Sequence, residues 1–106
     1  MTTITMNIQK ARTTQEYRTT LDPAEVLAAA KQFFTRRNNI YAAFIDKTGP
    51  TFVSLRGQGG EEVVVGVSPL TGGGTLVTGS TYLFDMQVAR FFATLPPVLA
   101  GPEVAA

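Results

Sequence analysis

The chain has 106 residues, of which 44% are hydrophobic and 16% charged, and its nine Lys and Arg residues nearly balance eight Asp and Glu residues. It contains no His, Cys or Trp, which excludes histidine general bases, thiolate nucleophiles, disulfides and metal sites built from imidazole or thiolate ligands. A net charge of +1 gives no basic footprint for nucleic acid, and no apolar run is long enough to cross a bilayer.

This length is typical of one domain, which can bury roughly two-thirds of its unfolded surface without disulfides or a metal. The low charged fraction favours a surface that contacts a partner.

Because Met1 to Lys10 lacks the apolar core of a signal peptide, we expect a cytoplasmic protein, held at a membrane only through a partner complex. We expect an N-terminal arm (1–16), a single α+β domain (17–95) and a Pro-rich C-terminal tail (96–106).

The arm is rich in Thr and other polar residues. Within it, Ile4, Met6 and Ile8 alternate with polar residues. This pattern is typical of a short strand, and the composition is typical of an arm or a flexible tail.

A strand over 17–21 is followed by the best-defined helix of the sequence. Asp22 can cap this helix, Pro23 suits its first turn, and Glu25 can reach back to the amide of the cap residue. Cations at 36–37 suit the last turn, and asparagines at 38–39 can end the helix. One apolar face recurs at helical spacing and consists of Val26, Leu27, Ala30, Phe33 and Phe34.

Four further strands are predicted between short turns that contain Gly or Pro. They span 40–46, 51–56, 61–69 and 75–83. Because the connections are short, these strands should form an antiparallel meander. The alternation in the third of them predicts that three side chains share one face, those of Val63, Val65 and Val67.

A second helix follows, with Asp85 as its expected cap. Its buried stripe is formed by Val88, Phe91, Phe92 and Leu95. Two prolines at 96–97 end the helix and predict an extended tail that crosses some surface. The order β-α-β-β-β-β-α predicts an α+β fold, in which a four- to five-stranded antiparallel sheet carries two helices packed on one face.

Three segments carry a resemblance to a known superfamily: Leu21 to Val26 at the first helix, the hairpin Val67 to Val77, and the closing helix from Asp85. Over residues 17–95 the chain resembles a shortened member of the START/Bet v 1-like superfamily, also called polyketide cyclase/dehydrase-like or helix-grip. The resemblance implies a curved antiparallel sheet around a C-terminal helix, with a cavity between them for an apolar ligand. It implies no particular catalytic residue.

Two groups of polar residues could carry chemistry, and each has a structural explanation. The Gly-rich stretch Arg56 to Glu62 could hold an anion, but it precedes a strand and its glutamates repel phosphate, which favours a hairpin loop. Asp46, Glu61, Glu62 and Asp85 are candidate acid–base groups or ligands of a hard cation. Adjacent strand residues point to opposite faces, so the two glutamates cannot act as a pair, and solvated or capping roles are favoured.

Cations could also gather into a patch for nucleic acid or anionic lipid. Charges at the end of the first helix complement its dipole, and no stacking platform lies beside them, so a structural role is favoured. The residues concerned are Lys31, Arg36 and Arg37, extended by Lys10, Arg12 and Arg18.

The composition and tails favour a non-enzymatic accessory subunit, with no catalytic, cofactor or metal site, that docks on a larger protein assembly. A membrane complex such as a photosynthetic reaction centre is one example of such an assembly. The tails and the open sheet edges are the expected contacts. The expected partner-binding residues are Ile4, Met6, Ile8, Lys10, Arg12, Pro96, Pro97, Val98 and Leu99.

Two other functions stay open. A carrier or sensor of a small apolar ligand requires a cavity of roughly 300 Å³ or more between sheet and helices. The expected lining of this apolar pocket is Phe33, Phe44, Tyr82 and Phe91, although core packing also explains the phenylalanines. An enzyme that uses only Tyr, Asp or Glu requires a buried carboxylate with a raised pKa.

Overall fold

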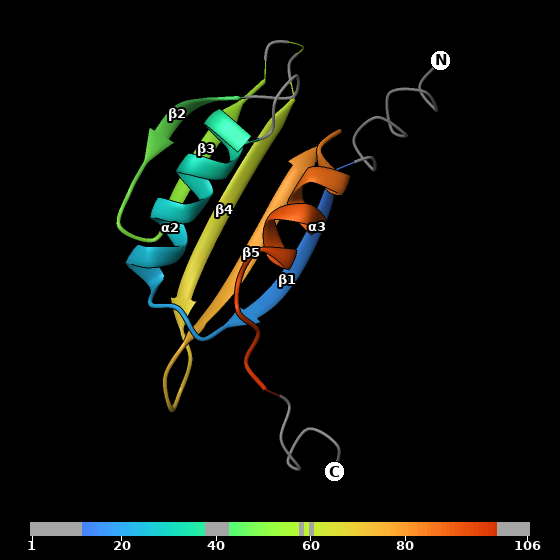
Figure 1. Cartoon of the computed structure of the whole chain (residues 1–106). Helices are drawn as coiled ribbons and strands as arrows, with labels where there is room; N and C mark the ends of the chain where they lie inside the picture. Colours follow the sequence, from blue (N-terminus) through green and yellow to red (C-terminus); the bar gives the residue numbers. More distant parts are fainter. Residues whose placement is uncertain (1–11, 38–42, 58, 60, 100–106) are drawn as a thin grey trace.

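The computed structural model describes residues 12–37, 43–57, 59 and 61–99 (Figure 1). The order of elements agrees with the order predicted from the sequence. The strands and helices are β1 (Thr13–Thr19), α2 (Pro23–Gln32), β2 (Phe44–Thr48), β3 (Phe52–Arg56), β4 (Glu62–Pro69), β5 (Thr75–Tyr82) and α3 (Asp85–Ala93).

The described strands form one antiparallel five-stranded sheet in the order β1-β5-β4-β3-β2. The meander β2 to β5 follows the chain, and β1 pairs with β5 at the far side. Both helices lie on the same face of the sheet (Figure 1), where α2 contacts β3, β4 and β5 and α3 contacts β5 and β1. The predicted α+β fold class is therefore confirmed, with β1 as the fifth strand.

Helix α2 begins as its sequence predicts. The Asp22 backbone N–H donates to Glu25 Oε1 at 2.9 Å, and Pro23 occupies the first turn, where no backbone donor is needed. The helix ends in a π-helical turn over Phe33–Arg37, where the Ala43 N–H donates to the Phe34 carbonyl at 2.7 Å. The asparagines expected to end the helix, at 38–39, lie outside the described residues.

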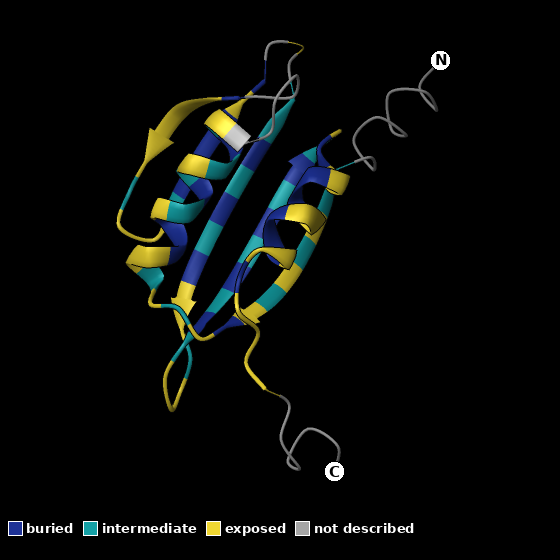
Figure 2. Cartoon of the chain, viewed as in Figure 1, coloured by how far each residue is buried: buried dark blue, intermediate teal, exposed yellow. Residues whose placement is uncertain are grey.

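The core lies between the sheet and the two helices. Buried and half-buried residues alternate along β4 and β5 (Figure 2), and Val63, Val65 and Val67, which were predicted to share one face, are all buried. The Phe91 ring lies 5.5 Å from that of Phe34, and both side chains are fully buried. Aromatic rings from both helices thus close the core over the valines of the sheet.

Strand β1 starts earlier than expected. It begins at Thr13, which pairs with Thr81, and not at Tyr17. The polar composition concealed this segment, yet β-branched Thr suits a strand whose alternate residues face water. The expected arm boundary at residue 16 therefore falls inside the sheet, and residues 13–16 belong to the domain.

The start of α3 also differs from the prediction. Phe84 occupies the N-cap position, and Asp85 lies in the first turn, where its charge complements the helix dipole. The Phe84 N–H donates to Thr81 Oγ1 at 3.3 Å, and that hydroxyl donates to the Glu62 carbonyl at 2.6 Å. A buried threonine of β5 thus satisfies the backbone donor at this junction, which the local sequence did not indicate.

The β4–β5 turn offers a test of backbone packing. Gly73 and Gly74 both have positive φ, but a Cβ on Gly74 would lie 2.6 Å from the Thr19 carbonyl oxygen, whereas one on Gly73 would meet nothing within 4 Å. We expect Gly73→Ala to lower the free energy of unfolding by about 1 kcal/mol and Gly74→Ala by at least about 1 kcal/mol more. Urea unfolding of both variants measures the difference, and equal losses would contradict this packing.

Candidate binding surfaces

The C-terminal segment Pro96–Leu99 lies along the outer edge of β1. The Thr20 N–H and the Thr19 hydroxyl both donate to the Pro96 carbonyl, at 3.1 and 2.7 Å. The Val98 N–H donates to the Arg18 carbonyl at 3.1 Å. The expected extended segment therefore crosses the protein's own sheet edge, and the two prolines, which have no N–H, leave Val98 to donate from this segment.

The side chains of this segment point mostly into solvent. Leu99 is 84% exposed and Val98 is 37% exposed, although their backbone is held beside β1. The remaining expected partner contacts of the arm, Ile4, Met6, Ile8 and Lys10, lie outside the described residues.

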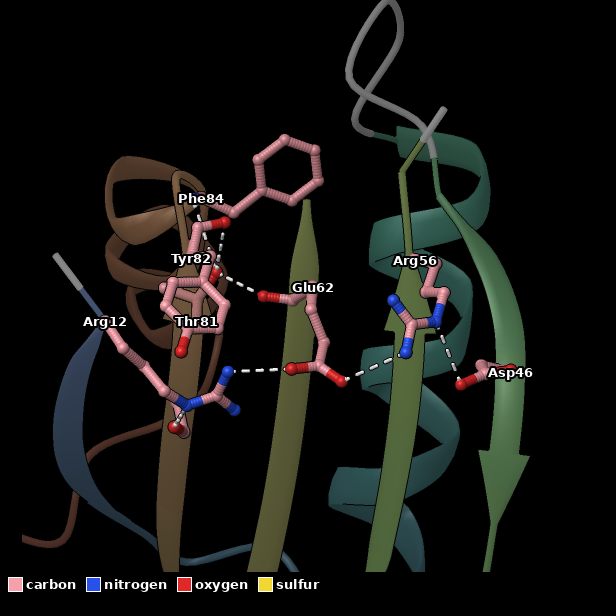
Figure 3. A network of polar contacts seen from close by, with 8 residues as sticks. Arg12, Asp46, Arg56, Glu62, Thr81, Tyr82 and Phe84 are labelled. Atoms are coloured by element: carbon pink, nitrogen blue, oxygen red, sulfur yellow. Dashed lines mark hydrogen bonds and ion pairs between the residues drawn. The ribbon is translucent and has the colours of Figure 1, made fainter. Parts of the chain in front are cut away.

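Arg12 belongs to a row of side chains across the face of the sheet that the helices leave uncovered. Cross-strand partners share a face, and Tyr82, Glu62, Arg56 and Phe44 are successive partners across β5, β4, β3 and β2. The Arg12 guanidinium lies over the Tyr82 ring, 4.7 Å from its centroid (Figure 3). These five residues, Arg12, Tyr82, Glu62, Arg56 and Phe44, are called the charged row below.

Glu62 joins the two arginines of the charged row. Arg12 Nη1 lies 2.7 Å from Glu62 Oε1, and Arg56 Nη2 lies 3.6 Å from Glu62 Oε2 (Figure 3). Arg56 Nε also donates to Asp46 Oδ2 at 3.2 Å. Two cations and two carboxylates thus neutralise one another, and partly exposed pairs of this kind contribute at most about 1 kcal/mol each. The charge of Arg12 is satisfied within the molecule.

The rest of the uncovered face carries mostly small or polar side chains, with Val64 and Phe52 among the apolar exceptions. Such a face is typical of an antiparallel sheet with one side in water. Its next two cross-strand rows are Thr14, Ser80, Val64 and Ser54, and then Glu16, Thr78, Gly66 and Phe52.

The residues expected to line one apolar pocket lie on opposite faces of the sheet. Phe91 is fully buried on the helix side, where half-buried Phe33 packs against it with ring centroids 5.6 Å apart. Tyr82 and Phe44 belong to the charged row on the other face, and Phe44 is 53% exposed. These four side chains therefore do not line a common cavity.

A groove of about 600 Å³ lies instead between α2 and the edge strand β2. Helix α2 packs on β3 and β4, so it leaves the helix-facing side of β2 partly open. Ile45 pairs with buried Leu55 and shares its face, yet Ile45 is 44% exposed. The described lining is Ala24, Leu27, Ala28, Lys31, Gln32, Thr35, Arg36, Ile45, Gly49 and Pro50.

This groove was not predicted from the sequence, because it depends on β2 being the edge strand and on α2 packing over β3 and β4. Lys31 and Arg36 were considered as part of a patch for nucleic acid or anionic lipid, and a structural role at the helix end was favoured. The sequence signal that could have indicated the groove is Ile45, an apolar residue in a strand whose residues are all exposed. A second hollow, of about 120 Å³, lies between Phe33 on the π-helical turn and Leu95 after α3.

The described acidic residues do not form a reactive centre. None of them is buried, and no group of three or more is placed to hold a metal ion within the described part of the chain. Glu61 accepts the Gly59 N–H through Oε1 at 3.0 Å and so supports the hairpin loop. Among the described helices, none is long and apolar enough to span a membrane.

No protein-family model, curated protein or solved structure matches the chain. The resemblance to START/Bet v 1-like proteins therefore stays a prediction.

Proposed function

We propose that the protein is a non-enzymatic accessory subunit that docks on a larger protein assembly through its C-terminal segment and the neighbouring sheet surface. The observation that carries the proposal is the presentation of Leu99, which is 84% exposed although the backbone just before it is hydrogen-bonded to β1. An exposed apolar side chain on an anchored backbone is suited to contact with a partner.

The hydrogen bonds that anchor the segment reduce the conformational entropy that association with a partner would cost. Pro96 and Pro97 have restricted backbones, and hydrogen bonds from Thr20 and Val98 hold the segment along β1. A contact that is ordered in advance loses less conformational entropy on binding. Full burial of one leucine side chain contributes about 1.5–3 kcal/mol, which is a factor of roughly ten or more in affinity.

A non-enzymatic role is supported by the described carboxylates. Glu62 and Asp46 are paired with arginines, Glu25 accepts a backbone N–H at the start of α2, and none of the three is buried. An acid–base enzyme without His or Cys requires a carboxylate in a desolvated site. The proposed partner is a larger assembly in the cytoplasm or at a membrane surface.

Substitution of the C-terminal segment tests the proposal. We expect Leu99→Asp and Val98→Asp each to weaken association with the assembly at least about tenfold, because a carboxylate cannot be buried against an apolar surface without a large penalty. The measurement is the amount of partner that co-purifies with the tagged protein from its own host. Thr71→Asp, in the exposed β4–β5 turn, is the matched control. Unchanged co-purification of both tail variants would contradict the proposal.

A second candidate function is a carrier of a small apolar ligand. The observation that favours it is the groove between α2 and β2, whose volume of about 600 Å³ lies in the usual range for ligand sites. Its place differs from the cavity that the START-like resemblance implies, since between sheet and helices the core contains fully buried Phe34, Phe91 and Val65.

A further inference from the structure

We propose that the groove between α2 and β2 binds a linear amphiphile with an anionic head group, a medium-chain carboxylate being the simplest example. The proposal rests on the second candidate function, the ligand carrier, and is independent of association with a protein assembly. It follows from the apolar lining of the groove, from the position of its cations and from the fact that no described residue forms an ion pair with them.

The groove has an apolar lining on both sides. Ala24, Leu27 and Ala28 line it from α2, and the two alanines are exposed, short side chains that leave room beside the helix. Ile45 and Pro50 line it from β2 and the β2–β3 turn. Ile45 is the informative residue, because it lies on the core side of the sheet and yet is 44% exposed. An acyl chain packed against Ile45 would bury the part of this side chain that is exposed to solvent.

The polar residues of the lining gather toward the end of α2. Lys31 lies in the last turn of the helix, and Arg36 follows in the π-helical turn. The lining residues in the first turns of α2 are alanine and leucine. Strand β2 runs alongside α2 in the opposite direction (Figure 1). Pro50, which follows the end of β2, therefore lies toward the start of α2. The groove therefore has an apolar end and a cationic end, which suits a ligand with a tail and a charged head.

The two cations of the groove differ from the arginines of the charged row. Arg12 and Arg56 each contact a carboxylate, whereas Lys31 and Arg36 have no ion-pair partner among the residues that the structure describes. No described carboxylate lines the groove. The Thr35 hydroxyl, which also lines the groove, is neutral and donates to the Lys31 carbonyl at 2.6 Å. A carboxylate head group would be paired here by two cations that no described carboxylate neutralises.

The first experiment is a titration of the ¹⁵N-labelled full chain with decanoate below its micellar concentration, followed by NMR. We expect saturable amide shifts that are confined to Ala24–Arg36 and Ile45–Gly49. Octanoate and hexanoate should bind progressively more weakly, by about twofold or more per methylene removed. The neutral alcohol 1-decanol should bind at least about tenfold more weakly than decanoate, because it leaves Lys31 and Arg36 unpaired.

Variants separate the head-group site from the apolar lining. The double variant Lys31→Gln/Arg36→Gln should weaken decanoate binding about tenfold and leave 1-decanol binding unchanged. Ile45→Asp should weaken the binding of both compounds. Lys47→Gln is the matched control, because Lys47 lies on the same strand but pairs with Ser54 on the opposite face of the sheet.

Each outcome of these experiments supports or overturns the anionic specificity, the carrier function or both. If 1-decanol binds in the groove as tightly as decanoate, the anionic specificity is wrong while the carrier function stands. If neither compound shifts the groove residues, both the proposal and the carrier function fail. Shifts that depend on protein concentration alone would assign the groove to a second copy of the chain. Binding to phosphatidylglycerol vesicles without decanoate binding would assign the cations to a membrane surface. Either result overturns the proposal.

Discussion

Gly79→Val is expected to lower the free energy of unfolding by about 2–3 kcal/mol, because it forces α3 away from the sheet. Gly79 is buried in β5 on the helix side, and a Cβ there would lie 2.5 Å from Val88 Cγ1 and 3.3 Å from Phe92 Cζ. Both neighbours are buried and belong to α3. The helix approaches the sheet this closely only because the strand residue beneath it has no side chain. Chemical denaturation followed by circular dichroism measures the loss.

Gly66→Val provides the matched control for this substitution. Gly66 lies in β4 on the uncovered face, and its nearest neighbour would be the Thr78 hydroxyl, at 2.7 Å from the added Cβ. That side chain can rotate, and valine favours a strand, so we expect a change within about 1 kcal/mol. A loss at Gly66 as large as the loss at Gly79 would contradict the close packing of α3 on β5.

Phe91→Ala is expected to be the most damaging core truncation, with a loss of about 3–5 kcal/mol. Phe91 is fully buried, and its ring centroid lies within 5.6 Å of those of Phe33 and Phe34 on the other helical segment. Truncation removes these contacts and leaves a cavity where the two helices meet. Since domains of this size have about 5–15 kcal/mol of stability in total, the melting temperature should fall by about 12 °C or more.

Phe44→Ala is the control for the loss of a phenyl ring. Phe44 is 53% exposed on the edge strand, so the same truncation there should cost less than about 1 kcal/mol. Thermal unfolding of the two variants under one condition makes the comparison. Similar losses would mean that the interface between the two helices is not the centre of the core.

Local signals predicted the parts of the fold that depend on near neighbours in the chain. Asp22, Pro23 and Glu25 define the start of α2, and the alternation of β4 correctly placed Val63, Val65 and Val67 on one face. Short turns predicted the meander, and the spacing in α3 predicted Phe91 as a buried residue. In each case the periodicity or the cap is complete within one element.

The errors have a common physical origin in contacts between distant segments. Thr13 joins the sheet because Thr81 lies opposite it, and the Thr81 hydroxyl accepts the Phe84 N–H at the start of α3, where Phe84 and not Asp85 is the cap residue. Arg12 pairs with Glu62 across the sheet, a contact that the sequence did not indicate. A one-dimensional pattern does not contain strand order or register, which determine these pairings.

The candidate sites depend on the same long-range information. The pocket expected from Phe33, Phe44, Tyr82 and Phe91 is divided because register places Phe44 and Tyr82 on the uncovered face. The groove beside Ile45 exists because β2 became the edge strand and α2 packed elsewhere. Side-chain chemistry could be read from the sequence, but the choice of which side chains meet could not.

The most direct test of the accessory-subunit proposal is the native mass of the protein in a gentle extract of its own host. Size-exclusion chromatography with quantitative mass spectrometry of the fractions measures both the size and the stoichiometry. The proposal predicts elution far above the 11.4 kDa of the free chain, together with a fixed set of partner proteins. Elution as a free 11.4 kDa monomer would contradict it.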